Sequence, residues 1–232
     1  MELGEGVDLG GSSKQIAKQI AVQLDQVPPD TPSIRALRKR ISRQLIAIDR
    51  NTLLRVAHEL IRYARFGRFV AYELVKHHDR TVSSMTRAEV EKLGHGMRNW
   101  GEVDTFSCYI AGPAWRMGLI TETVIQGWAR SRDWCWRRAA LVSTVPLNAA
   151  AHGGKGDTKR TLAICGILAH DRHDMVVKAM SWALRTLAMR DAKAVRRFLA
   201  DHQGELGARV IREVNNKLRT GLKNPKKRRT SA

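Results

Sequence analysis

The fold is decided by the stretch TPSIRALRKRISRQLIAI, residues 31–48. Its apolar residues recur every three or four positions, which places them on one side of a helix: Ile34, Leu37, Ile41, Leu45 and Ile48. Thr31 and Pro32 are typical of a helix start. We therefore expect a helix with one buried side.

The same spacing runs through most of the chain. It begins with Ile16, Ile20 and Leu24 and continues through residues 53–63, 66–77, 98–110, 120–130, 134–145, 159–170, 175–189, 192–201 and 208–222. Few segments alternate with period two, so strand content should be close to nil. We expect about a dozen short helices joined by short turns.

This pattern predicts an all-α protein built as a superhelical stack of HEAT-like antiparallel helical repeats. Such a stack curves and offers a long concave face, which suits a rod such as duplex DNA. A compact helical bundle is the alternative that the spacing leaves open. We expect one domain at residues 11–222 between disordered termini at 1–10 and 223–232, with a mobile Gly-rich loop at 148–158.

The charge of the chain indicates a polyanionic partner. There are 41 Lys and Arg against 22 Asp and Glu, a formal net charge of +19. The C-terminal cations Lys223, Lys226, Lys227, Arg228 and Arg229 supply only five of these charges. The body of the protein is therefore basic in its own right, which favours a cationic binding surface.

Other classes are disfavoured by the sequence. No apolar run reaches the roughly 20 residues of a membrane span, and no secretory signal is present, so we expect a cytoplasmic, nucleoid-associated protein of bacterial type and a monomer. Cys108, Cys135 and Cys165 lie far apart and are interpreted as reduced core residues. The histidines at 77–78 and 170–173 lie at predicted helix ends and are interpreted as capping residues, so no metal or cofactor is expected.

Trp100 and Asp104 form the pair most suggestive of chemistry. Their spacing puts them on one side of a helix, one turn apart. An aromatic face attracts positive charge, and a carboxylate stabilises a cation that develops as a bond breaks. The alternative is a core tryptophan beside a solvated aspartate.

Two further clusters combine cations with aromatic residues. WCWRRAA (134–140) places arginines among tryptophans, and KAMSWALR (178–185) places Lys178, Trp182 and Arg185 on one side of a helix. This composition is typical of surfaces that neutralise phosphates and pack against sugars or bases. Taken alone, each cluster is equally compatible with helix-packing tryptophans and solvated cations.

Taken together, these clusters resemble the AlkD family of DNA alkylation repair glycosylases. NWGEVD (99–104), WRRAA (136–140) and KAMSWALR (178–185) follow in the family's order and separation. Weaker similarity at IRAL (34–37) and AHEL (57–60) extends the resemblance to roughly residues 31–222. Two features depart from the family pattern. Gly101 stands where an acidic residue is common, and Trp134 and Trp136 straddle the position of a single tryptophan.

The resemblance implies a C-shaped stack with a basic concave face that holds duplex DNA. It also implies excision of cationic N-alkylated purines, such as 3-methyladenine and 7-methylguanine, in base excision repair without a metal or cofactor. By the same resemblance, Asp104 is the catalytic carboxylate, Trp100 and Trp182 flank the damaged nucleotide, and Arg138, Arg185 and Lys178 contact DNA. Two alternatives remain: a non-catalytic protein that recognises damaged, bent or branched DNA, and a HEAT-like scaffold for protein or RNA.

Overall fold

The stretch 31–48 forms a helix over most of its length, but the helix ends at Gln44, before the predicted end. The structure is a computed structural model that describes residues 6–225. Helix α2 (Thr31–Gln44) begins behind Asp30, whose carboxylate accepts a hydrogen bond from the Ser33 backbone N–H at 2.8 Å. Ile34, Leu37, Ile41 and Leu45 are buried as predicted. A 3-10 turn (Leu45–Ala47) follows the helix, so Ile48 lies outside it and is only half-buried.

The chain divides into two compact units, Met1–Gly96 and Met97–Ala232, whereas the sequence predicts one domain at residues 11–222. The regular structure within residues 6–225 is entirely helical and includes no strand, which confirms the all-α class. The first unit contains α1 (Ser13–Asp25), α2, α3 (Arg50–Tyr63), α4 (Gly67–Lys76), α5 (Asp79–Val82) and α6 (Arg87–Gly94). The second contains α7 (Trp100–Phe106), α8 (Gly112–Arg116), α9 (Glu122–Ala129), α10 (Trp134–Val142), α11 (Val145–Asn148), α12 (Thr158–Ile167), α13 (Asp174–Leu187), α14 (Ala192–Asp201) and α15 (Ala208–Thr220).

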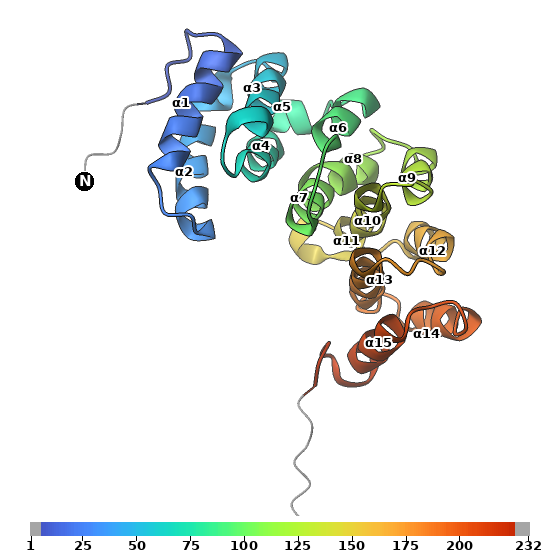
Figure 1. The fold of residues 1–232 in the computed structure, drawn as a ribbon. Helices are drawn as coiled ribbons and strands as arrows, with labels where there is room; N and C mark the ends of the chain where they lie inside the picture. The colour runs from blue at the N-terminus through green and yellow to red at the C-terminus, as the bar shows by residue number, and fades with distance from the viewer. Residues whose placement is uncertain (1–5, 226–232) are drawn as a thin grey trace, which may run out of the picture. The chain divides into compact units, whose positions relative to one another are not determined.

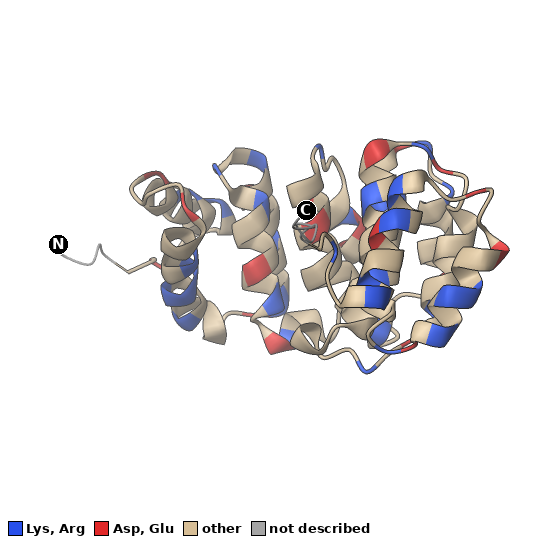
Figure 2. Cartoon of the chain, turned by 90° about the horizontal axis from the view of Figure 1, so that it is seen from below, with Lys and Arg blue, Asp and Glu red and all other residues tan. Residues whose placement is uncertain are grey.

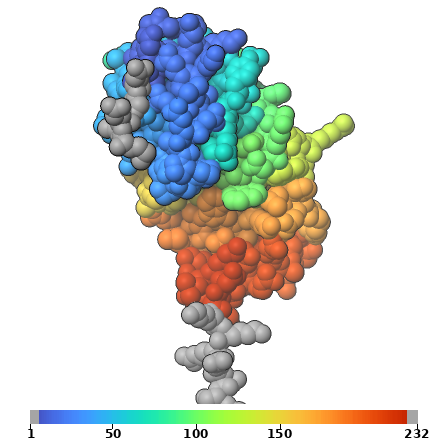
Figure 3. All heavy atoms as spheres, turned by 60° about the vertical axis from the view of Figure 1, so that its left-hand side comes forward, coloured from blue at the N-terminus to red at the C-terminus, as the bar shows by residue number. Residues whose placement is uncertain are grey.

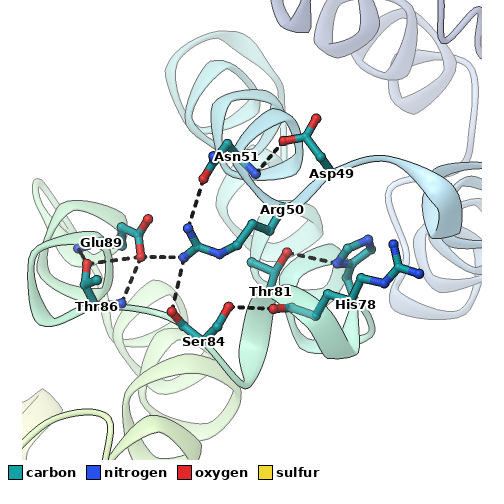
Figure 4. A network of polar contacts seen from close by, with 9 residues as sticks. Asp49, Arg50, Asn51, His78, Thr81, Ser84, Thr86 and Glu89 are labelled. Carbon is teal, nitrogen blue, oxygen red and sulfur yellow. Dashed lines mark hydrogen bonds and ion pairs between the residues drawn. The ribbon is translucent and has the colours of Figure 1, made fainter.

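In the first unit, α1 packs on α3, and α4 packs on both α2 and α3 (Figure 1). Arg50, at the start of α3, links this layer to α6 (Figure 4). Its guanidinium donates to the Glu89 carboxylate at 2.7 Å and to the Ser84 carbonyl at 3.3 Å. The same Glu89 accepts from the Thr86 backbone N–H at 2.8 Å and so caps α6.

The second unit is a row of helices in which each member packs on the next. The row runs α7, α10, α13 and α15, and α9, α12 and α14 flank it (Figure 1). Within this unit, the colours follow one another from green through orange to red in the space-filling view (Figure 3). Contact of each repeat with its neighbouring repeats is the rule for helical repeats, so the HEAT-like stacking is confirmed within the unit. The C shape of the whole chain stays a prediction.

The helix that begins at Trp100 changes its winding part-way. A π turn (Ser107–Ala111) joins α7 to α8, so the helix predicted for residues 98–110 extends to Arg116. Immediately after the π turn, an added Cβ at Gly112 would lie 2.7 Å from a Pro146 side-chain carbon. The close approach of α8 and α11 therefore depends on glycine. π turns often occur at functional sites.

The Gly-rich segment 148–158 differs from the mobile loop expected, because hydrogen bonds hold its backbone. Arg190 donates to the carbonyls of Asn148 and Gly154 at 2.8 and 3.0 Å. The N–H of Gly156 donates to the Leu147 carbonyl at 3.0 Å. Gly156 has φ +107°, a left-handed conformation that favours glycine. The glycine-rich composition of residues 148–158 therefore reflects a tight turn rather than a flexible linker.

Replacing Gly154 with alanine should destabilise the protein by roughly 1–3 kcal/mol, the usual cost of overpacking. An added Cβ would lie 2.5 Å from the Pro146 carbonyl oxygen and 2.6 Å from the Leu147 carbonyl carbon, and backbone cannot move aside cheaply. Gly127→Ala is the matched control. Nothing lies within 4 Å of its added Cβ inside α9, so helix propensity should raise stability by about 0.5–1 kcal/mol. Urea unfolding of both variants measures these effects, and equal shifts would contradict the packing argument.

The ends of the described chain are also held in part. Val7 is buried, and its N–H donates to the Gln44 side chain at 3.3 Å, so residues 6–10 of the predicted disordered terminus contact the first unit. At the other end, Lys223 lies against Glu213 of α15. The remaining predicted tail residues, 226–232, lie outside the described part. No helix within residues 6–225 is long and apolar enough to cross a membrane.

Candidate nucleic-acid-processing site

Helix α7 positions Trp100 and Asp104. Asn99 caps its start and accepts from the Glu102 N–H at 3.1 Å. Trp100, in the first turn, is 59% exposed, whereas the Asp104 side chain is only 17% exposed. The alternative of a core tryptophan beside a solvated aspartate is therefore wrong, because the exposures are reversed. Gly101 lies in the first turn, where an added Cβ would meet only the Asn99 side-chain oxygen, at 3.3 Å.

Arg138 of α10 holds the Asp104 carboxylate from both sides. Its Nε donates to Oδ1 and its Nη2 donates to Oδ2, each at 2.8 Å. Nη1 donates to the backbone carbonyl of Met175 at the start of α13. The Arg138 side chain is only 6% exposed, so most of its donors are directed at protein groups. This two-point geometry fixes the plane of the carboxylate.

Burial raises the pKa of Asp104 above the ordinary aspartate value, and the hydrogen bonds and charge of Arg138 lower it by less. Arg138 therefore counteracts the desolvation of the carboxylate without cancelling it. A carboxylate in this environment loses its charge at a higher pH than a solvated one. Its interaction with a cation is also stronger than it would be in water.

Helix α13 supplies the opposite wall, with Lys178, Trp182 and Arg185 in successive turns. The Lys178 ammonium pairs with Asp174 at 2.7 Å. The Arg185 Nε donates to the Ser181 hydroxyl at 3.1 Å, and Ser181 in turn donates to the buried Glu213 carboxylate of α15 at 2.6 Å. Helix α15 therefore determines how Arg185 is presented.

These side chains line one cavity of about 350 Å³ in the second unit. The lining residues are Trp100, Asp104, Arg138, Met175, Lys178, Trp182, Arg185 and Lys223. All six residues singled out from the sequence are among them. Asp104 is the single carboxylate in this described lining, which otherwise consists of two tryptophans, a methionine and four cations.

Sequence reasoning missed Met175, Lys223 and the supporting Glu213. Met175 follows the cap of α13 and carries no pattern that distinguishes it from a core methionine. Lys223 follows α15 and reaches Glu213 at 3.5 Å, in a stretch that the sequence assigned to the tail. The one signal for Glu213 in the sequence is that it is the single acidic residue of a helix that carries four arginines and lysines.

Trp134 and Trp136 do not line the cavity. Trp136 packs against Trp128 and Phe106, with ring centroids 4.8 and 5.9 Å away. Trp134 stacks on His173 at 5.0 Å, and that histidine caps α13 by accepting from the Met175 N–H. Both tryptophans therefore support the helices that carry the cavity.

The comparison with protein families now identifies the chain. A family model described as DNA alkylation repair enzyme matches residues 27–218, most of the chain. The chain belongs to this family. The match confirms the resemblance seen in the sequence and extends over both compact units. A comparison of the chain with individual curated proteins found no match.

Membership of the alkylation repair family makes DNA the substrate and accounts for the basic surface. Lys and Arg positions are spread over helices of both units (Figure 2). The three cysteines are buried, and burial raises the pKa of Cys135 to about 11, which removes thiolate character near neutral pH. Among residues 6–225, no cluster of three or more His, Cys, Asp or Glu side chains is placed to hold a metal.

Proposed function

We propose that this protein is a monofunctional DNA glycosylase that releases cationic N-alkylated purines, such as 3-methyladenine and 7-methylguanine, from duplex DNA. One observation carries the proposal. The cavity lining combines a single carboxylate, Asp104, with two tryptophans and four cations. Glycoside hydrolysis of a neutral leaving group usually needs two carboxyl groups, one of which acts as a general acid. The single carboxylate therefore favours a leaving group that needs no protonation.

An N-alkylated purine meets this requirement because it already carries a positive charge. When its bond to C1′ of the deoxyribose breaks, the electron pair moves onto the base and neutralises it. The sugar becomes an oxocarbenium-like cation, and the oxygen of water then bonds to C1′ and loses its proton. Only the sugar cation and the water need help from the protein.

Asp104 is suited to both tasks. Its fixed carboxylate stabilises positive charge on the sugar and accepts a hydrogen bond from the attacking water. Arg138 acts as a positioning residue, since its donors hold the two Asp104 oxygens at 2.8 Å. This role differs from the DNA contact that the resemblance implied for Arg138, because the side chain is almost fully buried.

The remaining lining residues are suited to the nucleotide backbone. Trp100 and Trp182 offer aromatic faces that pack against sugars, and Lys178, Arg185 and Lys223 offer positive charge to phosphates. A lesion held by its backbone can react without insertion of the base into a deep protein pocket.

Analysis of the free bases released from alkylated duplex DNA tests the proposal. The wild-type protein should release 7-methylguanine and 3-methyladenine, and the strand should stay intact until alkali cleaves it at the abasic site. Salt-sensitive binding without base release would instead support a non-catalytic DNA-binding protein. Preference for RNA or protein over duplex DNA in competition would support a scaffold.

A further inference from the structure

A second cavity lies between α14 and α15, on the side of α15 that faces away from α13. Its volume is about 530 Å³. It is lined by three arginines, two asparagines and one leucine: Arg196, Arg212, Arg219, Asn215, Asn216 and Leu218. All three arginines are exposed. No acidic residue contributes to this described lining.

The arginines of this cavity differ from five others in the second unit. Arg137, Arg138, Arg160, Arg197 and Arg209 each pair with an aspartate within 4 Å. Arg196, Arg212 and Arg219 form no ion pair within the part of the chain that the structure describes. Three guanidinium groups around one cavity repel one another, and an anion bound among them would relieve this repulsion.

The two sides of α15 have different partners. Val210, Glu213 and Val214 are buried, and Glu213 bonds to Ser181 of α13. Arg212 and Arg219 lie on the exposed side, two turns apart. Packing inside the unit therefore uses one side of α15 and leaves the arginine side free for a ligand.

A hydrogen bond in the turn that follows α15 connects one residue of each cavity. Asn216 lines the second cavity, and its side-chain amide donates to the backbone carbonyl of Lys223 at 3.1 Å. The Lys223 side chain lines the first cavity, beside Arg185. Residues of the two cationic cavities are thus in direct contact at the end of α15.

We propose that Arg196, Arg212 and Arg219 form a phosphate-binding site for the DNA backbone that flanks the lesion. This inference rests on the proposed function, which places the lesion in the first cavity. Guanidinium groups bind phosphate oxygens with two parallel hydrogen bonds, and asparagine amides add further donors. One DNA strand presents a phosphate about every 3.4 Å along the helix axis, so a strand that leaves the first cavity brings several phosphates past the second.

The test compares two triple variants of the full chain. Arg196→Ala/Arg212→Ala/Arg219→Ala removes the cavity cations. Arg130→Ala/Arg132→Ala/Arg197→Ala removes the same charge at exposed positions that line neither cavity. The cavity variant should bind a long duplex about tenfold or more weakly, and its salt slope should fall by roughly 0.9 for each phosphate that the protein no longer neutralises. Its rate of base release at saturating protein should be unchanged.

A short duplex that ends close to the lesion should bind the cavity variant and wild type alike, because it lacks the flank. Equal losses in the two triple variants would indicate a general charge effect and overturn the assignment. A cavity variant that loses binding of inorganic phosphate but keeps its affinity for long DNA would also overturn it, in favour of a free anion. Failure of the wild type to release any base would refute the glycosylase proposal. The difference in DNA affinity between the cavity variant and the wild type tests the phosphate site alone.

Discussion

Asp104→Asn is expected to slow release of 7-methylguanine under single-turnover conditions by roughly 10²–10³-fold, the usual loss when one preorganised electrostatic group is removed from an active site. Asparagine keeps the shape of the side chain and one acceptor for Arg138. It removes the negative charge that stabilises the sugar cation. DNA affinity should change little, because the cations and tryptophans of the cavity remain.

Asp171→Asn provides the matched control for this variant. Asp171 pairs with Arg137 at 2.6 Å, as Asp104 pairs with the adjacent Arg138, and its side chain is also largely buried. It does not line the cavity. Both variants should show similar losses of melting temperature, but only Asp104→Asn should lose excision. Equal excision rates in wild type and Asp104→Asn would remove Asp104 from the chemistry.

Arg138→Gln is expected to move the acidic limb of the excision rate to higher pH, because a neighbouring positive charge favours the ionised form of a carboxyl group. In the wild type, burial already raises the pKa of Asp104, so activity should be present above this raised value and lost as the pH falls through it. Loss of Arg138 removes the influence that lowers the pKa and leaves the burial that raises it.

The control for this shift is Arg137→Gln, which breaks the neighbouring pair with Asp171 and leaves the Asp104 carboxylate paired. Its acidic limb should coincide with that of the wild type. Arg138→Lys retains a positive charge without the two-point hydrogen bond and should give a smaller shift than glutamine. An acidic limb that stays in place in Arg138→Gln would show that Arg138 does not control the charge of Asp104. Melting curves at each pH separate this outcome from unfolding.

Local sequence was enough to predict most helices. In residues 31–48, the cap at Asp30 and the apolar spacing act within a few positions of one another. The π turn after α7 could not be predicted in this way, because it accompanies a close approach between Gly112 and Pro146 from another helix. The Gly-rich segment was misjudged for the same reason, since Arg190 lies over thirty positions away in sequence.

In the candidate site, too, contacts between residues far apart in the sequence could not be predicted from local patterns. Trp100 and Asp104 share one helix turn, and Lys178, Trp182 and Arg185 share one helix side, so spacing alone groups them. Only the family resemblance predicted that the residues of these two helices lie at one site. The supporting contacts of Glu213 and Lys223 depend on how α15 packs on α13, which no local pattern encodes. For this reason the sequence predicted side chains of the cavity but not what holds them in place.

Under the proposed function, a single carboxylate suffices because the leaving base is already cationic. The most direct test is the single-turnover rate of the wild-type protein on two duplexes of identical sequence, one with 7-methylguanine and one with hypoxanthine, a neutral damaged purine. We expect rapid release of 7-methylguanine and no release of hypoxanthine above the spontaneous rate. Comparable release of both bases would contradict the proposed function, because a neutral base needs an acid that the described cavity lining does not supply.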